Sequence, residues 1–260
     1  MSRTSWKLTD RLQKQERVIG PAMGADFPLC VTELLAGLGY DFIWLDLEHG
    51  EMDLSTAIQH VRMARRCDVA AIIRVPSAGD ARITPLLDAG VQAIVFAQTE
   101  TVDQARQQVA VTKFPPLGSR SVTNRKGFTD YLQRDIGQIL DEGNRNVITL
   151  PQIESVAGVE RITELLAVEG IGGAMMGLSD LAVDMGLAGN SAHPDVVSAA
   201  RTVCDACAGS GKWFAVYSRD EKALQEWKAA GAQILVATSI MSFISRAGGD
   251  ILGRLKGEPS

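Results

Sequence analysis

The stretch DFIWLDLEHG (41–50), with DLSTAIQHVRMARRC (53–67) and AAIIRVP (70–76) after it, decides the fold. The first and third segments are short apolar runs, which are typical of strands buried on both faces of a parallel sheet. The middle segment has the apolar spacing of an amphipathic helix. The stretch therefore predicts a strand, a crossover helix and a parallel strand.

This unit recurs along the chain. Eight runs read as strands, at 17–23, 41–48, 70–76, 92–98, 147–154, 172–179, 213–218 and 233–239. Most follow the previous run by about 20 to 30 residues, with helix-like segments between them. Eight such units in a chain of 260 residues suit a single (β/α)₈ TIM barrel over 1–260, whereas a doubly wound sheet usually has fewer strands.

Six segments read most clearly as helices, at 28–39, 53–67, 81–90, 101–112, 155–170 and 220–231. Two segments depart from the period. The connection at 113–131 is long and rich in Pro, Gly, Ser and Arg, and the segment at 181–196 carries Gly, Asn and Pro. Long connections inside a compact domain are usually functional or lie at interfaces.

Composition excludes several classes of protein. The net charge of −5 argues against nucleic acid as a partner. No apolar run is long enough to span a membrane and the N-terminal segment has no signal-peptide core, so we expect a cytoplasmic protein. Cys204 and Cys207 have C-x-x-C spacing, but they lie in a helical pattern with no second ligand pair, and we expect packed thiols.

Polar side chains gather where the predicted strands end, which in a TIM barrel is the catalytic face. Predicted strand two ends in Asp46, Glu48 and His49, and strand three ends in Arg74. Strand five ends in Gln152 and Glu154, and strand six ends in Ser179 and Asp180. The polar groups are thus concentrated on these four strands.

Glu154 and Asp180 lie 26 residues apart, one βα unit, so they are expected on neighbouring strand ends. Two carboxylates with open positions suit Mg²⁺ or Mn²⁺, with Arg74 as a fixed cation beside them. The alternative is that Asp180 caps the following helix. His49 is either a general base or a hydrogen-bonded histidine of the rim.

The motifs LDLEHG, IIRVP, LLDAG, PPLGSRS, PQIES and GLSDLAVDMGLAGNSAHPDV occur in this order from about Gly20 to about Gly253. Together they resemble the HpcH/HpaI family of class II, metal-dependent pyruvate aldolases, typified by 4-hydroxy-2-oxoheptanedioate aldolase. The resemblance implies a barrel of the phosphoenolpyruvate/pyruvate type.

The resemblance also implies roles for particular residues. His49 matches the general base, Asp88 the aspartate that raises its basicity, and Arg74 the arginine that stabilises the transition state. Glu154 and Asp180 match the metal ligands. The Gln152 side chain and the backbone amides at Ser179 and Asp180 match the groups that contact the pyruvate carboxylate and metal-bound oxygens. Arg74 is also expected to bind substrate.

The activity implied is reversible cleavage of a 4-hydroxy-2-oxo acid to pyruvate and an aldehyde, with Mg²⁺, Mn²⁺ or Co²⁺ as cofactor. His49 would take the C4 hydroxyl proton, and the metal and Arg74 would stabilise the enolate. The implied assembly is a homohexamer, a trimer of dimers, in which a C-terminal helix at about 240–256 is exchanged between subunits.

Some features leave alternatives open. Leu117 and Ser179 depart from the family pattern, which leaves the substrate range undecided. Asp88 precedes strand four, so it is expected at the opposite end of the barrel from His49 unless two subunits share a site. No lysine ends a predicted strand, which disfavours a Schiff-base aldolase. A citrate lyase or malyl-CoA lyase type of reaction and a non-catalytic barrel remain as alternatives.

Overall fold

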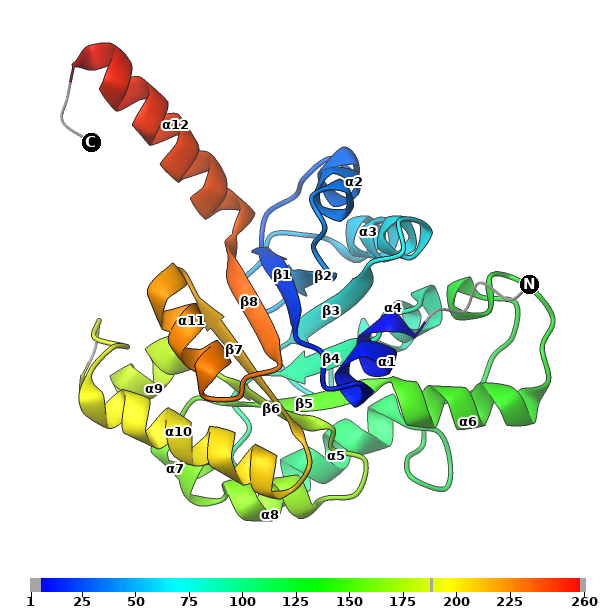
Figure 1. Cartoon of the computed structure of the whole chain (residues 1–260). Helices are drawn as coiled ribbons and strands as arrows, with labels where there is room; N and C mark the ends of the chain where they lie inside the picture. Colours follow the sequence, from blue (N-terminus) through cyan, green and yellow to red (C-terminus); the bar gives the residue numbers. More distant parts are fainter. Residues whose placement is uncertain (1–5, 188, 258–260) are drawn as a thin grey trace.

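The computed structural model describes residues 6–187 and 189–257 and shows a closed barrel of eight parallel strands in chain order (Figure 1). The strands are β1 (Val18–Met23), β2 (Phe42–Asp46), β3 (Ala70–Val75), β4 (Ala93–Phe96), β5 (Ile148–Ile153), β6 (Gly173–Met176), β7 (Trp213–Ser218) and β8 (Ile234–Ser239). The predicted (β/α)₈ fold is confirmed, with every predicted strand in its expected place.

Helices cover the outside of the barrel. They are α1 (Lys7–Gln13), α2 (Cys30–Gly37), α3 (Leu54–Arg66), α4 (Ile83–Ala89), α5 (Val102–Thr112), α6 (Ile136–Asn146), α7 (Val156–Glu160), α8 (Ile162–Ala167), α9 (Leu178–Asp184), α10 (Pro194–Gly209), α11 (Glu221–Ala229) and α12 (Ile240–Lys256), with a short 3₁₀ turn, η1 (Gly127–Thr129). The helix predicted at 155–170 is two helices, because the chain breaks at Arg161.

Three large clusters of apolar side chains make the core. One fills the barrel and includes Phe42, Trp44, Leu150 and Met175. The others lie between the strands and the surrounding helices. Successive strand residues point alternately into and out of the barrel, so each strand needs apolar residues on both faces, which explains the nearly continuous apolar runs.

Glycine permits close packing inside the wall. A Cβ atom on Gly20 of β1 would lie 2.1 Å from the Phe42 carbonyl oxygen and 2.5 Å from its ring. Only a residue without a side chain fits at this point, so Gly20 sets how closely β1 approaches β2.

The strand predicted at 41–48 ends earlier, at Asp46, so Glu48 and His49 lie in the turn that follows. The long connection after α5 also differs from a plain loop, because it continues into α6. It packs at the N-terminal end of the barrel, where Gly127 lies against Ala89, and not at the catalytic face.

The last helix leaves the body of the molecule. Helix α12 projects from the end of β8 away from the barrel (Figure 1). Of its described residues, only Ile240 is buried. Within 6–187 and 189–257, none of the helices combines the length and the apolar character that crossing a bilayer requires.

Replacing Gly20 by Ala is expected to destabilise the barrel by about 3 kcal/mol or more, because overpacking a wall of backbone atoms forces strands apart. Urea denaturation followed by circular dichroism measures this. Gly37→Ala is the matched control, since its Cβ would meet nothing within 4 Å, and its stability should change by less than about 1 kcal/mol. Equal stability of Gly20→Ala and the parent would contradict the constraint.

Candidate active site

A single carboxylate organises one side of the barrel mouth. Asp46 and Arg74 are register partners at the ends of β2 and β3. Asp46 Oδ1 accepts a hydrogen bond from Arg74 Nε at 3.0 Å, and Oδ2 accepts one from Nη2 at 2.5 Å. Oδ1 also accepts the backbone N–H groups of Glu48 and His49, at 3.1 and 3.3 Å. Asp46 thus ties the guanidinium of Arg74 to the turn that carries His49.

These bonds decide the ionisation of Asp46. Burial alone raises the pKa of its carboxyl group, but the hydrogen bonds and charge of Arg74 and the two backbone N–H groups outweigh burial and hold the pKa below its ordinary value. Asp46 is therefore ionised, and its lone pairs are occupied by protein donors.

Glu48 lies between Arg74 and His49. Its Oε2 atom is 3.1 Å from Arg74 Nη1 and 3.9 Å from His49 Nε2. The pKa of Glu48 is raised, chiefly by burial, against the opposing charges of Arg74 and His49. His49 itself is open to solvent, with 69% of its side chain exposed, so it can reach a ligand in the mouth.

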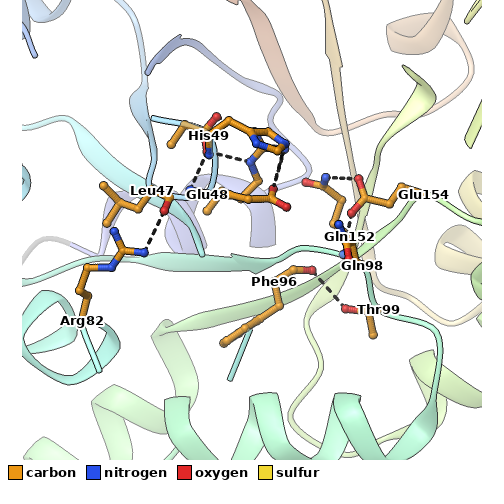
Figure 2. Close-up of polar contacts among 11 residues, drawn as sticks. Leu47, Glu48, His49, Arg82, Phe96, Gln98, Thr99, Gln152 and Glu154 are labelled. Carbon is orange, nitrogen blue, oxygen red and sulfur yellow. Dashed lines mark hydrogen bonds and ion pairs between the residues drawn. The ribbon is translucent and has the colours of Figure 1, made fainter. Parts of the chain in front are cut away.

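Glu154 approaches from the other side of the mouth, and Figure 2 shows Glu48 facing the pair formed by Gln152 and Glu154. Glu154 Oε2 accepts from Gln152 Nε2 at 2.5 Å, and Oε1 accepts from the backbone N–H of Gln98 at 2.6 Å. Burial raises the pKa of Glu154 despite these bonds, and the charges of Asp180 and Glu48 raise it further.

Gly177, directly after β6, makes room for Glu154. A Cβ atom at position 177 would lie 2.6 Å from Glu154 Oε2 and 2.7 Å from its Cβ. The missing side chain therefore leaves room for the carboxylate of Glu154.

Asp180 and Ser179 stand exposed in the first turn of α9. The N-cap of this helix is Gly177, and no side chain makes a capping hydrogen bond there. The alternative that Asp180 caps the helix is therefore wrong. Its charge instead acts on Glu154 and Glu48.

The mouth carries carboxyl oxygens, the type of ligand that hard divalent cations prefer. Asp46, Glu48, Glu154 and Asp180 bring four carboxyl groups to the mouth, and Arg74 is already paired with two of them. Among the described residues, the buried acceptor Gln152 Oε1 receives no hydrogen bond, and Glu48 Oε2 is engaged only in its ion pairs with Arg74 and His49. A cation or its water ligands would satisfy them, although no cluster of three or more His, Cys, Asp or Glu residues suited to a metal occurs in the described ranges.

Asp88 is the predicted site residue that the chain does not bring to the mouth. It lies near the end of α4, which runs back from the catalytic face to the N-terminal end of the barrel. There its Oδ1 atom pairs with Arg120 Nη2 at 3.3 Å, and Arg120 is buried between the rings of Phe114 and Phe128. Burial raises the pKa of Asp88, against the charge of Arg120. Within one chain, Asp88 and His49 stand at opposite ends.

Two supports of the site are not predicted by the sequence patterns. Arg82 pairs with Asp80 and donates from Nη2 to the Leu47 carbonyl oxygen at 2.9 Å, which holds the turn after β2 (Figure 2). Gln98 binds Glu154 through its backbone, in a left-handed conformation with φ of 51°. The close spacing of Asp80 and Arg82 in the sequence is compatible with their ion pair. No sequence signal marks the backbone contact of Gln98 with Glu154.

Most of the chain is similar in sequence to known proteins. The family model described as HpcH/HpaI aldolase/citrate lyase matches residues 27–245. A 5-keto-4-deoxy-D-glucarate aldolase of Shigella dysenteriae is 33% identical over 80% of this chain and 80% of its own length. A hydroxypyruvate/pyruvate aldolase of Deinococcus radiodurans is 31% identical over 88% of this chain and 82% of its own.

Solved structures with the same fold match nearly the whole chain. An HpcH/HpaI aldolase from Desulfitobacterium hafniense superposes with a TM-score of 0.92 at 25% identity, over 97% of this chain and 98% of its own. The citrate lyase β subunit of M. tuberculosis, complexed with oxaloacetate and magnesium, covers 86% of this chain and 92% of its own with a TM-score of 0.55. At 17% identity this second likeness shows the fold alone.

Asp46→Ala is expected to lower the free energy of unfolding by about 3 kcal/mol, because it removes the closest partner of a buried guanidinium. Amide hydrogen exchange at Glu48 and His49 should accelerate as well, since both N–H groups lose their acceptor. Asp53→Ala is the control, because it removes only an exposed N-cap bond to Thr56 and should cost about 1 kcal/mol. Unchanged exchange at residues 48 and 49 would refute this role of Asp46.

Proposed function

Because the chain belongs to the HpcH/HpaI aldolase/citrate lyase family, we propose that it is a metal-dependent class II aldolase that cleaves a 4-hydroxy-2-oxo acid reversibly to pyruvate and an aldehyde. Aldolases are carbon–carbon lyases, and the aldolases among its relatives support this reaction class. The observation that carries the proposal is the convergence of Glu154 and Asp180 with Arg74 and His49 around Glu48 at one mouth.

Glu154 and Asp180 are the proposed metal ligands, for Mg²⁺, Mn²⁺ or Co²⁺. The cation would supply Lewis acidity that polarises the 2-oxo group of the substrate. Gln152 and the backbone amides at Ser179 and Asp180 are the proposed contacts of the substrate carboxylate. Together these groups would fix the pyruvate half of the substrate over Gly177.

His49 would take the proton of the C4 hydroxyl group, directly or through a water molecule. The C3–C4 bond then breaks, the aldehyde leaves, and the electron pair moves toward the C2 oxygen. Arg74, held in place by Asp46, would stabilise the negative charge that develops on the substrate oxygens. Return of a proton to C3 completes pyruvate.

A lyase acting on a coenzyme A thioester is the second candidate, because the matching family model covers citrate lyase as well as aldolase. It would use the same cation and the same enolate chemistry on a different bond. Cleavage of a malyl or citryl thioester without cleavage of 4-hydroxy-2-oxo acids would favour it.

Chelation tests the metal. With EDTA, pyruvate release from a panel of 4-hydroxy-2-oxo acids should stop, and Mg²⁺, Mn²⁺ or Co²⁺ should restore it, in an assay coupled to lactate dehydrogenase. Full activity in chelator, or covalent trapping of substrate by borohydride, would overturn the proposal. His49→Ala should lower kcat at least 100-fold while Mn²⁺ affinity, measured calorimetrically, stays within about threefold, because His49 is not a proposed ligand.

The proposed assembly is a hexamer built as a trimer of dimers. Helix α12 carries exposed apolar residues at helical spacing, namely Met241, Ile244, Ile251, Leu252 and Leu255. A cavity of about 300 Å³ lies at its base, lined by Tyr40, Leu224 and Phe243 among others, where a barrel normally seats its last helix. We propose that α12 of one subunit covers this place on its partner, and that Asp88 meets the His49 turn of another subunit.

Ile244→Glu combined with Leu255→Glu should break the hexamer into smaller species, because the substitutions place charges on the apolar stripe. Sedimentation velocity measures the change in mass. Asp250→Lys, which alters charge on the polar side of the same helix, should leave the mass unchanged. A stripe variant that keeps the parent's mass would exclude α12 as an interface.

A further inference from the structure

One buried imidazole has no part in the proposed reaction. His60 lies in the middle of α3 and is fully buried. The other buried residues of this helix are Ala57, Val61 and Ala64, which are all apolar. A buried polar group costs free energy unless it is hydrogen-bonded. The hydrogen bonds of His60 therefore decide what a polar residue does at this position.

Both ring nitrogens of His60 have partners on other segments. Nε2 lies 3.0 Å from the carbonyl oxygen of Phe27, and Nδ1 lies 2.8 Å from Thr32 Oγ1. A carbonyl oxygen can only accept, so Nε2 carries the proton and donates to Phe27. Burial lowers the pKa of His60, against this hydrogen bond and the charge of Asp26, so at neutral pH the ring is neutral. Nδ1 then accepts from the Thr32 hydroxyl group. The imidazole thus joins α3 to its neighbour α2 and to the segment before α2 (Figure 1).

The Phe27 carbonyl group belongs to the connection between β1 and α2, residues 24–29, which we call the β1–α2 loop. A loop that follows a barrel strand lies at the catalytic face. Among the described residues, a second hydrogen bond joins this loop to the next βα unit, because the N–H group of Glu51 donates to the Gly24 carbonyl oxygen at 2.9 Å. The loop is thus fixed near α2 by His60 and near β1 by Glu51.

The Gly24 end of the loop lies against the turn that carries His49. A Cβ atom on Gly50 would stand 1.9 Å from the Asp46 carbonyl oxygen and 2.9 Å from that of Gly24. The backbone of the turn therefore packs directly on the loop, with no side chain between them. A displacement of the loop would move residues 47–51 and, with them, the imidazole of His49.

We propose that His60 is a positioning residue of the candidate active site, which fixes the β1–α2 loop through Phe27 and so places the turn that presents His49. His60 acts through backbone contacts and touches no substrate. A displacement of about 1 Å in a reacting group can lower a rate about 100-fold, so a small shift of this turn is enough to lower turnover. The inference rests on the proposed function, in which His49 is the base.

Two substitutions separate the two hydrogen bonds of the ring. In His60→Gln the side-chain amide can occupy the place of Nε2 and donate to Phe27, whereas the shorter amide of His60→Asn reaches only the place of Nδ1. His60→Asn should lower kcat at least tenfold, with KM changed by less than about threefold, because the binding groups Arg74 and Glu154 lie at the ends of β3 and β5. His60→Gln should keep kcat within about threefold of the parent.

Thr32→Val is the matched control. It removes the other hydrogen bond of the same buried imidazole but leaves the bond from Nε2 to Phe27. It should lower the urea midpoint of unfolding about as much as His60→Asn does, while kcat stays within about threefold of the parent. A role in stability alone would instead lower kcat in both variants alike.

Hydrogen exchange followed by mass spectrometry reports on the turn without any assay of activity. In peptides that cover residues 47–52, exchange should accelerate in His60→Asn. It should remain at the parent's rate in His60→Gln and in Thr32→Val, because only His60→Asn releases the loop that accepts from Glu51.

Equal losses of kcat in His60→Asn and Thr32→Val, or unchanged exchange over residues 47–52 in His60→Asn, would overturn the positioning role. If His60→Asn does not fold, His60→Gln decides the matter: slow exchange supports the role, and accelerated exchange despite the retained donor overturns it. A parent without aldolase activity would remove the proposed function, and the exchange comparison would still decide whether His60 places the turn.

Discussion

The mouth of this barrel depends on the bidentate pair between Asp46 and Arg74. The pair joins the ends of two neighbouring strands, and the same carboxylate fixes the backbone of the turn that presents Glu48 and His49. A guanidinium left unpaired at this depth would be costly, so each partner makes the other's burial possible. Rigid placement of charge follows, which is the condition for electrostatic stabilisation without reorganisation.

On the opposite side of the mouth, acidic side chains lie close together although their negative charges repel one another. Glu154 is buried and its pKa is raised, with Asp180 and Glu48 adding to the effect. Protein donors satisfy Glu154, but they do not neutralise the group of carboxyl side chains. A site of this kind binds protons or a divalent cation in competition, so metal binding there would release protons.

The sequence was sufficient for the fold and for most of the rim, because both follow from local rules. Buried parallel strands require apolar runs, and their carboxyl ends meet at one face, which brought Arg74, Gln152 and Glu154 into one prediction. Asp180 could not be separated from a helix cap until the structure showed that no side chain caps α9. The roles of Asp46 and Gln98 depend on hydrogen bonds to backbone groups, which residue types do not reveal.

Other features escaped prediction for a different reason. Helix α6 was not predicted, because it follows an irregular segment without a helical pattern. Asp88 was expected at the far end of the barrel from His49, and the structure places it there, paired with Arg120. Its predicted role can be fulfilled only between chains.

The position of helix α12 affects how the protein folds and assembles. A barrel whose last helix projects outward leaves part of its own wall uncovered, and the apolar stripe of that helix is equally bare. Under the proposed exchange, each chain completes the hydrophobic core of another. Folding then has a bimolecular last step, and the stability of the protein becomes a function of its own concentration. A newly made chain would be exposed to aggregation until it met a second copy.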